Sequence, residues 1–192
     1  KKLSEKCIEY YLKSLENVTE LQKIDISLFN DILVPQPENR FLRPTLFDLL
    51  AHRAIDFFMN SETGLTRPAD AFYINNESYF TNAADFSVLN IETRDSSSFA
   101  FLALKLFQQA IRFHLADKDP SALVDLDLKR LAYVNSNSTL ADKQEMYISA
   151  LEKLESRYKN HPSSTEVSFV LAQQWFEKGN KFNPLQGDAY KW

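Results

Sequence analysis

Three side chains that could bind a metal ion recur at helical spacing in the first third of the chain. Asp48, His52 and Asp56 stand four residues apart, so on a helix they share one face. Two carboxylates and an imidazole are ligands that zinc accepts. The two aspartates would lie ~12 Å apart along a helix axis, so they cannot both reach an ion bound by His52. The spacing therefore favours a solvated face on which Asp and His pair, and we predict no metal site.

The single cysteine and the three histidines are the remaining candidates for nucleophilic catalysis. Cys7 could act as a nucleophile with His52, His114 or His161 as its base, but no local motif accompanies it. It belongs to an apolar helical stripe, where a buried and inert thiol is usual. We interpret His114 as a cationic partner of a helix C-terminus and His161 as a structural residue of a turn. We therefore predict no catalytic residue and no enzymatic activity.

The composition argues against several other classes of function. The 192 residues carry a net charge of −4 with acids and bases interspersed, so no nucleic-acid surface is expected. With three glycines there is no glycine-rich phosphate loop, and the H-E-x-x-H and EF-hand spacings are missing, so we expect no cofactor. The longest apolar stretch, 99–116, is interrupted by Lys105, Gln108 and Arg112, which argues against direct membrane insertion.

Hydrophobic spacing predicts a mainly α-helical chain. The central segment 97–116 is apolar on every face except a polar stripe of Lys105, Gln108, Gln109 and Arg112, so it should lie between neighbours. Segment 123–128 alternates like a strand, but the preceding Asp-Pro start signal favours a helix. The predicted helices cover 2–16, 27–33, 45–59, 97–116, 120–134, 139–158 and 163–179.

Capping signals set several of these boundaries. Thr45 with Asp48, and Thr139 with Asp142, have the spacing of capping boxes at helix starts. Gly179 is expected as a left-handed C-cap at the end of the last helix. Between 60 and 95 the helical period fades, and 71–74 and 87–91 could be short strands or extended segments, with a short helix or hairpin between the long helices.

The last two predicted helices form a hairpin over 139–179 that resembles one tetratricopeptide-type (TPR) repeat, without a second copy in the chain. Its Tyr147, Tyr158, Trp175 and Phe176 could line a peptide groove, although such aromatics are more often the contact between paired helices. We predict stacked antiparallel helical hairpins, an α-α superhelix, as a single helical domain 1–192 or a fragment of a larger protein. Its parts are N-terminal helices over 1–59, an irregular connection over 60–95 and hairpins over 96–192.

Three stretches carry a family resemblance: Arg40 to Phe58, Leu65 to Ala69, and the run from Phe113 to Val167. They resemble the helical region that precedes the macroglobulin domains in large bacterial alpha-2-macroglobulin-like envelope proteins. Where that family traps proteases covalently, it uses a thioester between the cysteine and glutamine of a Cys-Gly-Glu-Gln motif. The residues that follow Cys7 include neither the glycine nor the glutamine of that motif, so no thioester is expected here.

The resemblance implies a non-catalytic structural or protein-interaction module of a larger secreted or envelope protein in a protease-inhibitor context. The implied location is the periplasm or cell envelope of a bacterium. The implied partners are other domains of the parent protein or separate proteins, with proteases reached only through the parent. Two alternatives stay open: a free-standing TPR-like peptide-binding adaptor, and a helical hydrolase or transferase that uses His52 or Cys7. The sequence does not indicate which residues bind a partner.

Overall fold

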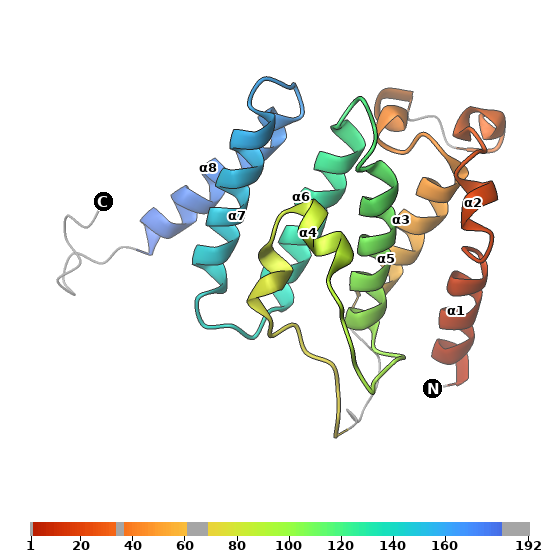
Figure 1. Ribbon diagram of the computed structural model, residues 1–192, viewed down its shortest axis with the longest axis horizontal. Coiled ribbons are helices and arrows are strands. Elements are labelled where there is room, and N and C mark those ends of the chain that lie inside the picture. The colour runs from red at the N-terminus through yellow and green to blue at the C-terminus, as the bar shows by residue number, and fades with distance from the viewer. Residues whose placement is uncertain (1, 34–36, 61–68, 182–192) are drawn as a thin grey trace.

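A computed structural model describes residues 2–33, 37–60 and 69–181 of the chain, and within these ranges the secondary structure is helical without strands. Six longer helices follow one another in a row (Figure 1). They are α1 (Lys2–Lys13), α3 (Leu46–Phe58), α5 (Phe99–His114), α6 (Ser121–Asn137), α7 (Lys143–Tyr158) and α8 (Ser164–Asn180). The prediction of a mainly α-helical fold is confirmed.

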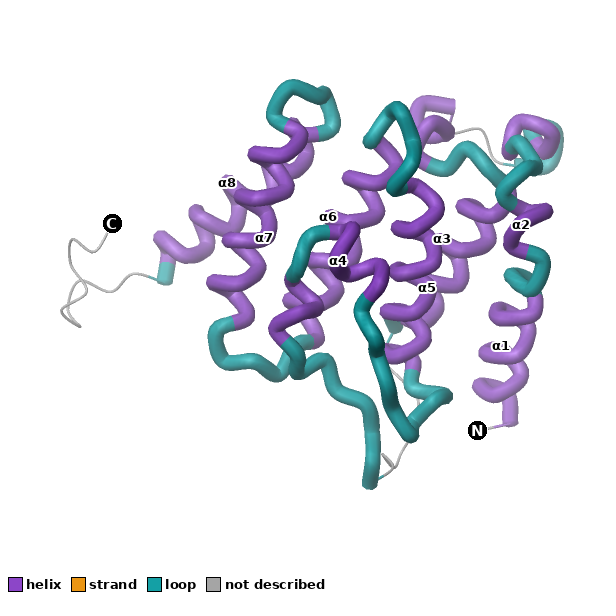
Figure 2. Tube along the Cα trace, in the orientation of Figure 1, coloured by secondary structure: helices purple, strands orange, loops and turns teal. Residues whose placement is uncertain are grey.

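Each helix of the row packs against the next one along the chain. Contacts join α1 with α3, α3 with α5, α5 with α6, α6 with α7, and α7 with α8. Figure 2 shows that the loops between α5, α6, α7 and α8 lie alternately at opposite ends of the helices, so neighbours run antiparallel. Helices α1 and α8 therefore form the two ends of the row (Figure 1).

Short helices connect and cover the row. Near the N-terminus these are α2 (Val18–Leu21) and the 3-10 helices η1 (Ile26–Phe29) and η2 (Pro37–Leu42). The described part of the predicted irregular connection contains η3 (Glu77–Phe80) and α4 (Ala83–Val88). Helix α4 packs on α5, and η3 contacts α6 and α7. The expected short helix is therefore present. Of the two alternatives for 71–74 and 87–91, the strands are not formed: 71–74 is a non-helical segment with one isolated bridge, from Ile74 to Ser138, and 87–88 belong to α4.

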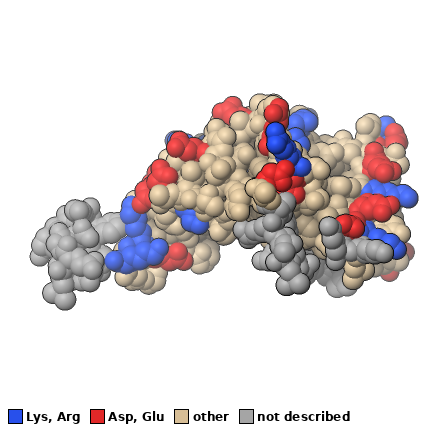
Figure 3. Space-filling model, turned by 90° about the horizontal axis from the view of Figure 1, so that it is seen from below, with Lys and Arg blue, Asp and Glu red and all other residues tan. Residues whose placement is uncertain are grey.

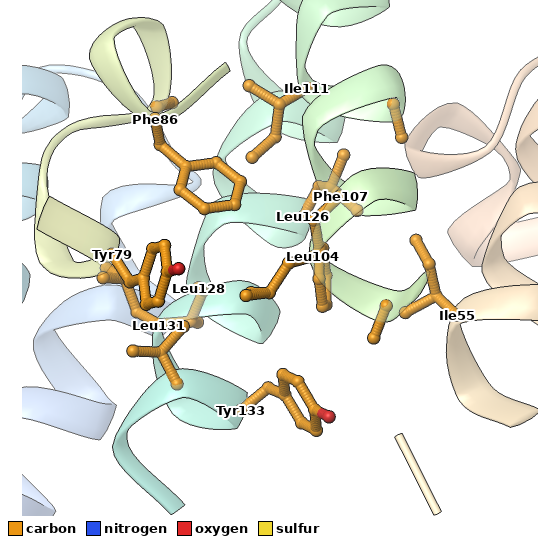
Figure 4. Close-up of a cluster of buried hydrophobic side chains, with 14 of the residues drawn as sticks. Ile55, Tyr79, Phe86, Leu104, Phe107, Ile111, Leu126, Leu128, Leu131 and Tyr133 are labelled. Carbon is orange, nitrogen blue, oxygen red and sulfur yellow. The ribbon is translucent and has the colours of Figure 1, made fainter. Parts of the chain in front are cut away.

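The core lies where α4 and η3 meet α5 and α6. Figure 4 shows Phe86 of α4 beside Ile111 of α5, with Leu104 and Leu131 below them. Phe86 and Ile111 are fully buried, and so is Phe107 of α5. Because α3, α4 and α6 all contact α5, the prediction that this helix lies between neighbours is confirmed.

The predicted polar stripe of α5 is wrong at Gln108, whose side chain is only 3% exposed. Its Nε2 donates to the carbonyls of Phe86 at 2.9 Å and Leu89 at 2.8 Å. Arg112 from the same stripe donates to the carbonyl of Ser87 at 2.7 Å. The last carbonyls of a helix have no partner within it, and the stripe supplies donors to the end of α4.

The capping predictions have mixed outcomes. At α3, Thr45 Oγ1 accepts from the Asp48 amide and Asp48 accepts from the Thr45 amide, so the first capping box is confirmed. The second is wrong, because no side chain caps α7 and the Thr139 amide donates instead to the Ile74 carbonyl. Gly179 lies inside α8, without a left-handed backbone, so its predicted role is also wrong.

The surroundings of α6 explain why its sequence alternates like that of a strand. Its described neighbours are α5 on one side and α7 on the other, with η2 and η3 adding contacts. Burial on several sides leaves no single apolar stripe, so both Leu126 and Asp127 are buried although they are adjacent. None of the helices in the described ranges combines the length and apolar character needed to span a bilayer.

Candidate functional site

Polar side chains are buried where α3 meets the end of α5. His114 Nε2 lies 2.9 Å from Asp48 Oδ1, and His114 Nδ1 lies 2.7 Å from Asp117 Oδ2. Asp48 and His114 are 1% and 2% exposed. Through Oδ2, Asp48 also accepts hydrogen bonds from the amide and hydroxyl of Thr45. One carboxylate therefore caps α3 and ties it to α5.

The imidazole of His114 is held between two carboxylates. Burial lowers its pKa, but the hydrogen bonds and negative charges of Asp48 and Asp117 outweigh burial and raise the pKa above its ordinary value. In the charged form both ring nitrogens donate, which matches the two acceptors. His114 thus lies at the C-terminal end of α5, where its two nitrogens link the carboxylate of Asp48 on α3 to that of Asp117 in the following loop.

His52 lies one turn along α3 from Asp48 and is 3% exposed. Burial lowers the pKa of its imidazole to about 3, and the positive charges of Arg43, Lys129 and His114 act in the same direction. Its Nδ1 has no hydrogen-bond partner within the described part of the chain. The predicted solvated face is therefore wrong at Asp48 and His52, which are buried, whereas Asp56 stays exposed and pairs with Lys129 of α6.

Helix α6 completes this polar cluster. Lys129 forms an ion pair with Asp56 of α3. Asp125, one turn earlier on α6, has a buried Oδ2 without a partner among the described residues, and burial raises the pKa of its carboxyl. We call Asp48, His52, Asp56, His114, Asp117, Asp125 and Lys129 the α3–α5–α6 clamp.

The side chains of the clamp connect α3, α5 and α6 to one another. In the described ranges, no three His, Cys, Asp or Glu side chains are grouped so that they could hold a metal ion. Both nitrogens of His114 are occupied by carboxylates, so it has no free position for a substrate proton. His52 is neutral and enclosed. The chemistry that this arrangement performs is hydrogen bonding and ion pairing between helices.

A second buried polar group, which the sequence did not single out, lies on the opposite side of α6. Arg130 is fully buried, and its Nε lies 2.7 Å from Asp127 Oδ1. Its Nη groups donate to the carbonyls of Tyr79 and Thr81, and its guanidinium stands 4.4 Å from the centre of the Phe86 ring. In the sequence, the only indication of this buried ion pair is the spacing of Asp127 and Arg130, which stand three residues apart between apolar residues.

The structure does not join Cys7 to a histidine. Cys7 is half-buried and lines an open groove between α1 and α3. The other groove residues include Tyr11, whose ring stacks on Phe57 at 4.5 Å, and Arg53. None of the histidines lines this groove: His52 and His114 belong to the clamp, and His161 Nδ1 lies 3.0 Å from Ser163 Oγ in the turn before α8. The proposed Cys–His pairing is therefore not formed.

The four aromatic residues for which a shared peptide groove was the less favoured alternative lie apart. Tyr147 is buried in the core, whereas Trp175 and Phe176 are 41% and 70% exposed on α8. Tyr158 lines a separate cavity of about 380 Å³ where η3 and α4 face α6 and α7. We call this cavity the α4–α7 groove; it is lined by Phe80, Thr81, Asn82, Ala83, Asp85, Leu123, Asp127, Leu131, Ala150, Lys153, Leu154, Arg157 and Tyr158.

Helix α8 exposes its apolar residues to an unusual degree. Val167 and Leu171 are buried. Phe169 is 63% exposed, and with the exposed Ala172 and Phe176 it follows the i, i+3, i+7 spacing of one helix face. We call these three residues, together with Trp175, the α8 face.

Charge is dispersed over the surface seen in Figure 3, where Lys and Arg alternate with Asp and Glu and wide areas carry neither. The α4–α7 groove and the α8 face are thus the described features best suited to contact a partner. Comparison with protein-family models, curated proteins and solved structures gives no match.

Proposed function

We propose that this chain is a non-catalytic protein-interaction module that binds a neighbouring helical segment along the α8 face. The observation that carries the proposal is the exposure of Phe169, Trp175 and Phe176 on the last helix of the row. Contiguous apolar residues on a surface mark interaction sites in soluble proteins, and large aromatics dominate the energetics of such contacts.

The way the row is built suggests what binds there. In the row, α3, α5, α6 and α7 each pack against a helix on both sides, whereas the main neighbour of α8 among the described helices is α7. A further helix laid antiparallel along α8 would repeat the packing that already joins α7 to α8. We therefore propose a helical partner over an extended peptide at this face, since a helix offers the matching 3.6-residue spacing.

The resemblance to alpha-2-macroglobulin-like envelope proteins supplies the context of the proposal. In that context the partner is an adjacent part of the same parent polypeptide, and the location is the periplasm or cell envelope of a bacterium. The module would position neighbouring domains, and proteases would be reached only through the parent protein. The residue pattern of the segments 40–58 and 113–167 supports this context.

Site-specific photo-crosslinking in the natural polypeptide, produced in its own cells, tests the proposal. A photoreactive phenylalanine analogue replaces Phe176 in one variant and Phe41, which is 58% exposed away from α8, in the control. We expect irradiation to join position 176 to a helical segment of the same polypeptide, outside the row described here, and to leave position 41 unjoined.

Two outcomes would overturn this proposal. Equal crosslinking from positions 176 and 41, or none from either, would mean that the α8 face has no specific partner. A crosslink between position 176 of two separate copies would assign the face to self-association instead. Tandem mass spectrometry of mixed isotope-labelled copies distinguishes the two kinds of crosslink.

A further inference from the structure

The α4–α7 groove combines an apolar floor with a basic rim. The residues at its base are buried hydrophobic side chains from four elements: Phe80 of η3, Ala83 of α4, Leu123 and Leu131 of α6, and Leu154 of α7. The volume of about 380 Å³ lies within the range of ~300–1,000 Å³ that is usual for ligand sites. The space therefore suits one or two large side chains of a short segment.

The two basic residues of the rim have no partner in the described part of the chain. Lys153 and Arg157 stand one turn apart on α7, and both are exposed. Nearby charged groups are already engaged: Asp127 at the base is bound by Arg130, and Asp85 of α4 accepts a hydrogen bond from Asn82. The α7 rim thus presents two unpaired cations beside an apolar cavity.

The acidic and basic residues that line the cavity come from different elements. Asp85 and Asn82 belong to the start of α4, and Lys153 and Arg157 belong to α7. A ligand carboxylate is attracted to the α7 rim and repelled by Asp85, so this difference sets the side on which an acidic group binds. Tyr158, whose ring lines the same cavity, adds an amphipathic side chain at the end of the basic rim.

From this arrangement we infer that the α4–α7 groove binds a short acidic peptide segment. An apolar side chain of the peptide occupies the cavity, and neighbouring Asp or Glu carboxylates pair with Lys153 and Arg157. Arg157 can bind a carboxylate through two parallel hydrogen bonds, and Lys153 adds a second positive charge one turn away. This groove lies on α4, α6 and α7, separate from the α8 face, so its test is independent of the function proposed above.

Fluorescence anisotropy with defined peptides tests the inference. The probe is the fluorescein-labelled hexapeptide Glu-Asp-Leu-Phe-Asp-Glu, and the comparison peptides replace either the four acids by Lys or the Leu-Phe pair by Ala-Ala. We expect saturable binding of the acidic Leu-Phe peptide and binding about tenfold weaker, or weaker still, for each comparison peptide. Equal affinity for all three would overturn the inference, and so would no saturable binding of the probe at millimolar protein.

Charge-matched variants separate the groove from general electrostatic attraction. Lys153→Glu with Arg157→Glu should weaken binding of the acidic probe by about tenfold or more, because both rim cations are reversed. Lys118→Glu with Lys159→Glu changes the net charge equally at exposed positions outside the groove and should change affinity by about twofold or less. Equal losses in the two double variants would contradict binding in the groove.

A third variant tests the cavity itself. Ala150 lines the groove, and Ala150→Leu adds apolar volume inside it, so the acidic probe should bind about tenfold more weakly while the rim charges stay in place. Thermal unfolding followed by circular dichroism reports whether this variant folds. If Ala150→Leu unfolds, the charge-reversal variants still decide the question, because they alter exposed residues. Unchanged affinity in a folded Ala150→Leu variant would overturn the apolar part of the inference.

Discussion

Helices α6 and α8 have the same length, 17 residues, yet they place their side chains in opposite ways. Helix α6 buries the charged side chains of Asp127 and Arg130. Helix α8 leaves Phe169 and Phe176 in solvent. The difference follows from their places in the row, since α6 lies between α5 and α7, whereas among the described helices α8 packs mainly on α7.

This comparison shows what burial requires of a polar group. A buried charge is tolerated when its partners are buried with it, as the carboxylate of Asp127 and two backbone carbonyls are for Arg130. An exposed aromatic side chain, in contrast, costs little in the folded state because it is also exposed in the unfolded chain. Substitutions in α6 should therefore affect stability strongly, and substitutions on the α8 face should affect it weakly.

The largest effect is expected for Arg130→Met. This change leaves the Asp127 carboxylate buried without its cation and removes the donors to the carbonyls of Tyr79 and Thr81. Removing one member of a buried ion pair costs about 3–5 kcal/mol, so the free energy of unfolding should fall by that amount. Chemical denaturation followed by circular dichroism measures the loss.

The double variant Arg130→Met with Asp127→Leu serves as the control. It removes both charges together, so it should regain a large part of the lost stability, because apolar residues of similar volume often replace a buried ion pair without loss. A loss below about 1 kcal/mol in the single variant would show that the buried contacts of Arg130 contribute little to the free energy of unfolding.

A second effect concerns pH and the α3–α5–α6 clamp. The pKa of His52 is lowered from 6.5 to about 3 in the folded chain. Below pH 6.5 the unfolded chain therefore binds a proton that the folded chain does not bind, and the free energy of unfolding falls as pH falls. At pH 5 the loss attributable to His52 is about 2 kcal/mol relative to pH 8.

Two other clamp residues also affect how the free energy of unfolding depends on pH. The raised pKa of His114 gives stability that is present below pH 6.5 and is lost as pH rises through that raised value. The raised pKa of Asp125 opposes His52, because as pH falls from that raised value toward the ordinary 3.8 its carboxyl takes up a proton in the folded chain before it does so in the unfolded chain. His52→Leu should therefore flatten the profile between pH 6.5 and 5, and parallel profiles for the variant and the parent would contradict this account.

A smaller effect is expected where α5 supports α4. Gln108→Leu removes the donors to the carbonyls of Phe86 and Leu89, which then lie near a buried apolar side chain. The free energy of unfolding should fall by roughly 1–2 kcal/mol. Gln109→Leu is the matched control, because Gln109 is adjacent and less buried, and it should stay within about 0.5 kcal/mol of the parent. Equal losses in both variants would contradict the role of Gln108.

The periodicity of apolar residues was enough to predict the long helices, because each has at least one face against a neighbour. The Thr45–Asp48 capping box was also predictable, since it depends on residues close in sequence. Periodicity could not show that Asp48 and Gln108 are buried, because their partners His114 and Phe86 lie 66 and 22 residues away. Long-range pairing decided these positions.

The candidate sites were less predictable than the helices. Asp48, His52 and Asp56 were recognised as sharing a helix face that was expected to meet solvent, but Asp48 and His52 are buried and, of the three, Asp56 alone is exposed. The α4–α7 groove was missed, since it exists only because a stretch without helical period places η3 against α6 and α7 and α4 against α5. The resemblance to alpha-2-macroglobulin-like proteins stays a prediction.

The smallest effect is expected on the α8 face, which completes the comparison with α6. Phe169→Ser with Phe176→Ser exchanges side chains that are 63% and 70% exposed, so the free energy of unfolding of the isolated chain should change by about 0.5 kcal/mol or less per site. Leu171→Ala on the buried side of the same helix should cost about 2–5 kcal/mol, because it leaves a cavity against α7. Denaturation curves for both variants test this contrast within one helix. A large loss from the serine variant would mean that the aromatics stabilise α8 itself, and the face would then not be free to bind a neighbouring helix.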